Sequence, residues 1–216
     1  MSYKELWSCI FGSSVYLIFR VITAQRMKIL LVGGTPCTGK SSVSELLGKK
    51  LGRPVVDIGQ IALDNECIRE YDADRETSVI DEDCLAQAIS DYLEEEEHDL
   101  IIEGHYVDLI PGGQVERVFI LRTHPDELAL RLRNRGYSKE KVSENVESEI
   151  FGVCQLDAID AFGEERVYEV NTSNASVESV VEEILEFLKS GDASPRYDWM
   201  VELEQQGRLD DYIQEM

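Results

Sequence analysis

Short apolar runs alternate along the chain with longer segments whose apolar residues recur at helical spacing. The apolar runs cover residues 27–32, 54–58, 99–103, 116–122 and 166–171. Segments with helical spacing cover residues 42–48, 81–97, 138–162 and 177–188. An alternation of strands and helices predicts a parallel sheet with helices wound around it. We therefore predict an α/β fold built on a five-stranded parallel sheet.

Three segments call for more detailed predictions. Residues 59–78 are mostly polar, and their pattern permits a small helical excursion. Residues 123–126 read Thr-His-Pro-Asp, which predicts a helix start capped by Thr123, with Pro125 at the first helical position. The apolar residues of 138–162 keep one helical register throughout, and this predicts a single long helix.

The two ends of the chain do not follow this alternation. Residues 6–19 form a run of 14 residues without a charge, whereas a helix needs about 20 to span a bilayer. We expect residues 1–26 to be a dispensable extension before a functional start at Met27; the alternative is a membrane-associating helix. Residues 191–216 predict a linker and an acidic amphipathic tail, which either caps the domain 27–190 or docks on a partner.

Residues 34–41 are the stretch around which the chain is organised. They read Gly-Thr-Pro-Cys-Thr-Gly-Lys-Ser and match the phosphate-binding pattern G-x-x-x-x-G-K-[ST]. A predicted strand precedes them and a predicted helix follows, so backbone N–H groups and a helix start meet where an anion can bind. In this pattern Lys40 reaches the β- and γ-phosphates, and the Ser41 hydroxyl holds Mg²⁺. The alternative is a simple glycine turn between a strand and a helix.

A second polar group lies at the end of the predicted strand 99–103. Glu103 is the last residue of this apolar run, and His105 follows two residues later. An acid at the tip of a neighbouring strand can complete a site for Mg²⁺ and water, so we expect Glu103 to serve the metal. His105 is a candidate for positioning a water or the phosphate. The alternatives are a surface acid and an ordinary loop histidine.

Three arginines occupy alternate positions after the predicted helix start at 123–126. Arg131, Arg133 and Arg135 cannot share one helical face, and we interpret them as a helix end running into a flap at 134–138. Arginines over a phosphate stabilise the charge that spreads during transfer. The alternative is pairing with surface acids, which are abundant in this chain.

The charge balance limits the possible partners. The 216 residues include 43 acidic and 21 basic ones, for a formal net charge of −22. Such a charge repels nucleic-acid backbones, so we expect no direct grip on nucleic acid. Excess carboxylates suit either a salty cytoplasm or a basic protein partner, and both interpretations stay open.

The cysteines argue against covalent cross-links. There are five, an odd number without a C-x-x-C pair, at positions 9, 37, 67, 84 and 154. This usage argues against a disulfide framework or a zinc clip and is typical of a reducing cytosol. We therefore expect a cytoplasmic protein.

Taken in order, the motifs resemble those of the adenylate kinase isoenzyme 6 type family, whose members are nucleoside monophosphate kinase-like ATPases. The resemblance covers residues 27–188. The strings that carry it are Gly-Thr-Pro-Cys-Thr-Gly-Lys-Ser-Ser at 34–42, Val-Ile-Asp-Glu-Asp at 79–83, Ile-Glu-Gly-His-Tyr at 102–106, Leu-Arg-Thr at 121–123 and Arg-Leu-Arg-Asn-Arg-Gly-Tyr at 131–137. Each string alone is weak, whereas the whole set in this order is specific.

The resemblance implies a set of binding residues. Those expected on the ATP phosphates are Cys37, Gly39, Lys40, Ser41 and Ser42, together with Arg135 from a short lid at about 134–144. A flap at about 57–80 would bind the monophosphate, and the loop at Ala175 would lie near the adenine. Many family members have Asp where this chain has Glu103, which leaves the geometry of the attacking water open.

The resemblance also implies a function. The chain is expected to transfer phosphate from ATP to AMP or other nucleoside monophosphates with Mg²⁺, to hydrolyse ATP, and to act in late maturation of the 30S subunit and its 16S rRNA. A first alternative is an ATP-switched assembly chaperone for a ribosomal protein of the uS11 type, with incidental kinase activity. A second alternative is a kinase for a non-nucleotide small molecule.

Overall fold

A five-stranded parallel sheet forms the centre of the molecule. The computed structural model describes residues 27–72, 77–191 and 194–213. The strands are β1 (Ile29–Gly33), β2 (Val55–Asp57), β5 (Leu100–Glu103), β6 (Val115–Arg122) and β7 (Val167–Asn171), in the order β2-β5-β1-β6-β7. All pairings are parallel. The five-stranded sheet predicted from the apolar runs is confirmed.

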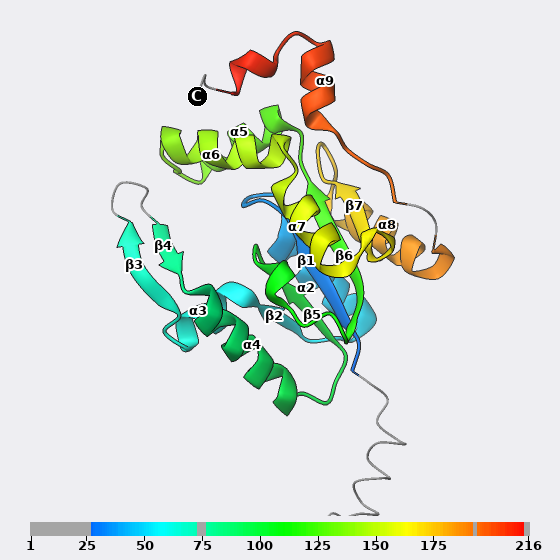
Figure 1. The fold of residues 1–216 in the computed structure, drawn as a ribbon. Helices are drawn as coiled ribbons and strands as arrows, with labels where there is room; N and C mark the ends of the chain where they lie inside the picture. The colour runs from blue at the N-terminus through cyan, green and yellow to red at the C-terminus, as the bar shows by residue number, and fades with distance from the viewer. Residues whose placement is uncertain (1–26, 73–76, 192–193, 214–216) are drawn as a thin grey trace, which may run out of the picture.

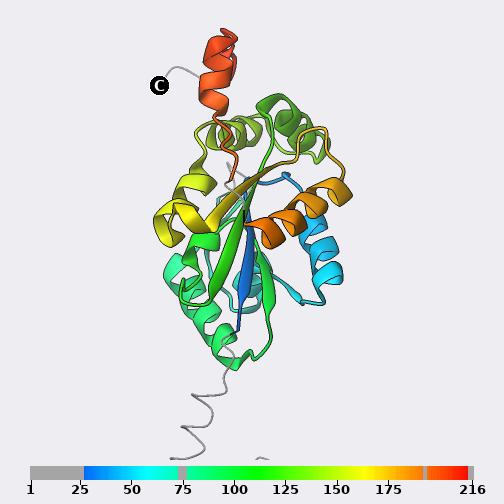
Figure 2. The ribbon, with the colours of Figure 1, turned by 90° about the vertical axis from the view of Figure 1, so that its right-hand side faces the viewer.

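Helices cover both faces of this sheet (Figures 1 and 2). One face packs on α3 (Ile58–Asp64), α4 (Glu82–Glu95) and α7 (Val153–Phe162), and the other packs on α2 (Lys40–Leu51) and α8 (Val177–Ser190). The central strand β1 is buried on both sides: Ile29 and Leu31 belong to the first core, and Leu30 and Val32 to the second. A continuous apolar run is what a strand buried on both faces requires.

A third apolar cluster lies beyond the carboxyl ends of the strands (Figure 1). It joins α5 (Pro125–Asn134), α6 (Lys139–Ile150) and α9 (Trp199–Gln205), the last of which comes from the C-terminal tail. The tail therefore packs back on the molecule through the buried side chains of Trp199 and Leu203. Three short 3-10 turns complete the described elements, at Val107–Leu109, Glu164–Arg166 and Leu209–Asp211.

The polar segment 59–78 contains more than the helical excursion suggested by its pattern. The helix α3 is present, but an antiparallel hairpin follows it, formed by β3 (Ile68–Asp72) and β4 (Thr77–Ile80). This hairpin projects from the sheet next to α3 and α4 (Figure 1).

The structure also pairs Cys67 with Cys84, whose Cα atoms lie 5.4 Å apart. The prediction of a chain without disulfide cross-links is therefore wrong for these two residues. An odd count does not exclude a pair, and the packing of α3 on α4 brings Cys67 against the start of α4.

Two helix predictions are also wrong in detail. The expected long helix 138–162 is split into α6 and α7 by Gly152, whose φ of +66° is left-handed. Glycine adopts this conformation without steric cost, and it ends one helix while opening the next. The cap of α5 is His124 rather than Thr123: the His124 Nδ1 atom accepts from the Asp126 N–H at 3.3 Å. Thr123 is buried, and its hydroxyl pairs with that of Thr172 at 2.7 Å.

The predictions for the N-terminal segment 1–26 lie outside the described residues. Within 27–72, 77–191 and 194–213, no helix has both the length and the apolar character needed to cross a bilayer. The division of the chain at residues 26 and 190 stays a prediction.

Candidate active site

The loop between β1 and α2 has the backbone that anion binding requires. Gly34 has a φ of +136°, and a Cβ there would lie 2.5 Å from the carbonyl oxygen of Leu121. Cys37 adopts a φ of +68°, a conformation that a residue with a side chain rarely takes. Successive N–H groups in such a curled loop, followed directly by a helix N-terminus, form a concave anion site.

Lys40 is the first residue of α2 and folds back over this loop. Its ammonium donates to the carbonyl oxygens of Gly34 at 2.8 Å and Thr35 at 3.1 Å. Burial lowers the pKa of Lys40. The nearby Cys154, Glu103, Cys37 and Glu149 side chains raise this pKa and so offset part of the effect of burial. The ammonium is therefore held in position at the loop.

Oxygen ligands gather at the ends of two neighbouring strands. Glu103 ends β5 and pairs in register with Asp57 at the end of β2. Burial raises the pKa of Glu103, although a hydrogen bond from Ser41 lowers it. Two carboxylates and a hydroxyl suit a hard cation such as Mg²⁺, so the donor set fits the expected metal. Among the described residues, no three His, Cys, Asp or Glu side chains form a cluster able to hold a metal alone.

His105 lies next to the same loop. Desolvation lowers the pKa of His105, and the positive charge of Lys40 lowers it further. The imidazole is therefore neutral at physiological pH, and its Nδ1 atom lies 3.5 Å from the Sγ atom of Cys154. A neutral ring can accept a proton from a water or a phosphate oxygen.

The three arginines point to different places. Arg131 ties α5 to the phosphate loop: it donates to the carbonyl oxygens of Cys37 and Thr38 at 3.4 Å each, and it pairs with Glu127 at 2.6 Å. Arg135, four residues later, lines a cleft that the phosphate loop and Arg131 also line. Arg133 lines a separate hollow between α5 and α6. The helix continues to Asn134, so the flap expected at 134–138 begins at the helix end.

One cleft of about 740 Å³ brings most of the predicted residues together. The predicted residues that line it are Cys37, Gly39, Lys40, Ser41, Ser42, Glu103, His105 and Arg135. Its size is within the range of small-molecule sites. Ala175 is not among its lining residues, and the part it plays near an adenine stays a prediction.

The site also contains an acid, Asp57, that the sequence analysis placed only at the start of the predicted flap. Asp57 lines the cleft together with Arg131, one of the three arginines predicted to lie over a phosphate. Asp57 could have been found as the acid next to the end of the second apolar run, much as Glu103 ends the third. Thr35, inside the loop motif, hydrogen-bonds the buried Glu149 at 2.5 Å. No local pattern indicates that contact, because 114 positions separate the two residues.

Comparison with solved structures supports the fold. A sugar kinase from Janibacter sp. superposes with a TM-score of 0.55 at 13% identity, covering 79% of this chain and 99% of that one. The shikimate kinase from Aquifex aeolicus gives 0.51 at 18% identity, covering 76% and 97%. At these identities the likeness concerns the P-loop kinase fold alone.

Sequence comparison identifies the family. Residues 30–152 match the model of an AAA domain family. A protein named "Putative adenylate kinase" from Pyrococcus abyssi is 39% identical over 163 residues, which cover 76% of this chain and 85% of the relative. The "Adenylate kinase isoenzyme 6 homolog" from Caenorhabditis elegans is 34% identical over 163 residues, covering 75% and 90%. With this fold and this phosphate loop, the chain belongs to the adenylate kinase isoenzyme 6 type family of P-loop kinases.

Proposed function

We propose that this kinase transfers the γ-phosphoryl group of ATP to AMP or another nucleoside monophosphate. One observation carries the proposal: the phosphate loop, the Ser41–Glu103 pair and Arg135 all face one cleft of about 740 Å³. Phosphoryl transfer needs in-line placement and charge neutralisation more than covalent chemistry, and this cleft offers both.

Each side chain has a defined part in the proposed reaction. An oxygen of the acceptor phosphate forms a bond to the γ-phosphorus while the bond from that phosphorus to the bridging oxygen breaks, which yields two nucleoside diphosphates from ATP and a monophosphate. Lys40 and Arg135 neutralise the phosphate oxygens during this step. A bound Mg²⁺, held by Ser41 and Glu103, would supply further positive charge at the β- and γ-phosphates.

Acceptor identity is the part of the proposal that product analysis tests. The protein is incubated with ATP, Mg²⁺ and a panel of nucleoside monophosphates and small-molecule alcohols, and the products are separated by chromatography. AMP or another monophosphate should be converted to its diphosphate. Lys40→Met should remove transfer while the thermal midpoint stays close to that of the wild type. Phosphorylation of an alcohol instead of any monophosphate would overturn the nucleotide assignment in favour of a small-molecule kinase.

We also propose, as a second function, that the protein hydrolyses ATP and acts in the cytoplasm during late maturation of the small ribosomal subunit. The net charge of −22 supports a basic partner such as a ribosomal protein of the uS11 type. Glu103→Gln and His105→Ala variants separate the two functions. If these variants still phosphorylate AMP while precursor 16S rRNA accumulates, the result favours the assembly role. Normal processing of 16S rRNA in a strain that carries Lys40→Met would exclude that role.

A further inference from the structure

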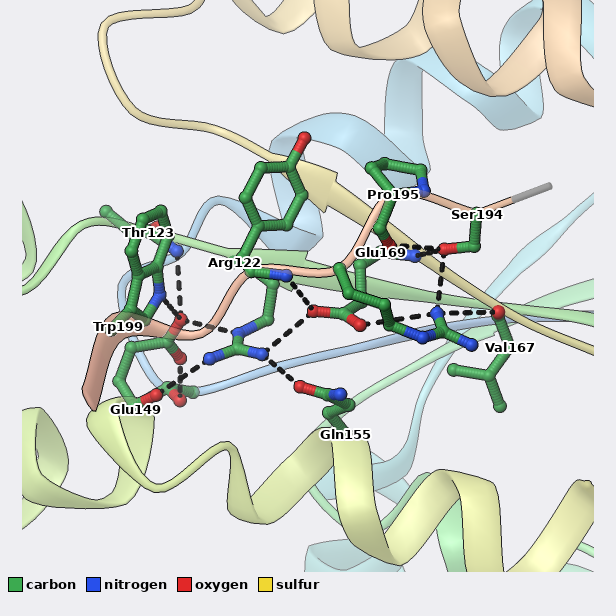
Figure 3. A network of polar contacts seen from close by, with 12 residues as sticks. Arg122, Thr123, Glu149, Gln155, Val167, Glu169, Ser194, Pro195 and Trp199 are labelled. Atoms are coloured by element: carbon green, nitrogen blue, oxygen red, sulfur yellow. Dashed lines mark hydrogen bonds and ion pairs between the residues drawn. The ribbon is translucent and has the colours of Figure 1, made fainter. Parts of the chain in front are cut away.

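Arg122, the last residue of β6, is the centre of a buried ion cluster (Figure 3). Its guanidinium donates to the carboxylate of Glu149 on α6 and to that of Glu169 on β7, both at 2.9 Å. It also donates to the Glu149 carbonyl oxygen at 2.8 Å and to the side chain of Gln155. Both glutamates are almost completely buried. One guanidinium can balance only one of these two carboxylates, so the cluster needs a second positive charge.

The Glu149 carboxylate connects this cluster to the phosphate loop. Its Oε2 atom accepts from the Thr35 hydroxyl at 2.5 Å, and its Oε1 atom accepts from the backbone N–H of Thr123 at 3.0 Å. The backbone carbonyl of Thr35 in turn accepts from the Lys40 ammonium. Glu149 is therefore joined by one hydrogen bond to the residue that follows Gly34 in the loop.

The segment 194–199 completes the cluster from the other side (Figure 3). The indole N–H of Trp199 donates to Glu149 Oε1 at 3.2 Å, and the backbone N–H of Tyr197 donates to Glu169 Oε2 at 3.3 Å. Arg196 pairs with Glu169 Oε1 at 3.3 Å and supplies the second positive charge. Ser194 accepts from the Glu169 backbone N–H at 2.9 Å. The tail thus neutralises the cluster that supports the loop.

We propose, resting on the function proposed above, that the C-terminal segment 194–199 is a positioning element of the ATP site, acting through Glu149 on Thr35. Trp199 and Arg196 are positioning residues rather than catalytic ones, because neither lines the cleft. Docking of this segment fixes the carboxylate that holds the phosphate loop. Nucleotide binding and tail docking therefore affect each other, as linkage between two sites requires.

A double-mutant cycle tests this coupling in the full-length protein. Trp199→Phe keeps an aromatic ring and removes the N–H donor, and Thr35→Val keeps the shape and removes the hydroxyl. Each single change should weaken Mg·ATP binding, measured by calorimetry, by about five- to tenfold. This is less than the full value of a hydrogen bond to a charged group, because the loss reaches the nucleotide only through the loop. The double variant should be no weaker than the weaker single variant. Effects that multiply would show that the two residues act independently and would overturn the proposal.

Matched variants separate positioning from general stability. Leu203→Val removes a methylene from the same apolar cluster, and the Leu203 side chain cannot hydrogen-bond Glu149, so this change should lower the thermal midpoint and leave ATP affinity unchanged. Arg196→Gln should weaken ATP binding, and Arg196→Lys should restore most of it by returning the charge. If Leu203→Val weakens ATP binding as much as Trp199→Phe does, the effect is one of stability and the proposal is wrong.

Fluorescence gives a readout that leaves the segment 194–199 unaltered. The chain has two tryptophans, so Trp7→Phe leaves Trp199 as the single emitter. Titration with Mg·ATP should change the emission of Trp199. This change should be absent from a protein that also carries Thr35→Val. Binding by calorimetry without any change in Trp199 emission would contradict the proposal while leaving the proposed function intact. Failure of the wild type to bind ATP at all would instead contradict the proposed function.

Discussion

Breaking the Cys67–Cys84 bond should destabilise the protein by an amount that follows from the chain length between the two residues. They are 17 positions apart, and the ring that they close contains the hairpin of β3 and β4. In the chain-entropy model, cross-linking a loop of this length removes about 10 cal/mol/K of entropy from the unfolded state, which stabilises the fold by about 3 kcal/mol at 25 °C.

That free energy corresponds to a measurable thermal shift. For a protein of this size, each kcal/mol moves the midpoint by about 2–4 °C, so reduction should lower it by about 6–12 °C. The assay is thermal unfolding followed by circular dichroism, with and without a phosphine reductant. A variant carrying Cys67→Ala and Cys84→Ala is the matched control: it should unfold near the midpoint of the reduced wild type and should not respond to reductant.

Two results would refute this reasoning. One is a wild-type midpoint that does not change on reduction while free-thiol titration shows that the bond has opened. The other is a double-alanine variant as stable as the oxidised wild type. Either outcome would mean that the hairpin ring contributes no entropy to stability, because the unfolded chain is already restricted in that region.

Three further predictions concern titrating groups. Hydrogen bonds from Arg208 and Tyr212 lower the pKa of Asp126 from 3.8 to about 2. The contribution of Asp126 to stability is therefore present above about pH 4 and is lost as the pH falls toward about 2. In urea unfolding, the difference in free energy of unfolding between the wild type and Asp126→Asn should shrink across that range. Burial raises the pKa of Cys154 to about 11, so iodoacetamide at pH 8 should label Cys37 well before Cys154, as mass spectrometry of peptides would show. Glu103→Gln should raise the Mg²⁺ concentration needed for half-maximal transfer by about tenfold or more, whereas the same change at exposed Glu45 should not.

The parts of the fold set by local pattern could be predicted from the sequence. The apolar run 27–32 became the central strand because both its faces are buried, and the glycine motif placed Lys40 and Ser41 at the start of α2. Glu103 reached the cleft because parallel strands end at one edge of the sheet. These features depend only on neighbouring residues and on the direction of the strands.

Features that depend on distant partners could not be predicted in this way. The apolar register of 138–162 continues across Gly152, so hydrophobic spacing alone concealed the break between α6 and α7. The Cys67–Cys84 pair follows from the packing of α3 on α4, and cysteine counting does not show it. Glu149 reads as one more acid on an acidic helix, yet it is buried by contacts with residues from three other parts of the chain.

The sheet has two edge strands, and the chain protects them differently. β2 is only three residues long, which leaves little backbone for another strand to pair with. The longer β7 is covered by the tail: Ser194 takes the Glu169 N–H, and Arg196 donates to the Val167 carbonyl oxygen at 3.4 Å. A protein cut before Ser194 would expose these two main-chain groups of β7, where a strand of another molecule can add. Removal of this short stretch is therefore expected to promote self-association.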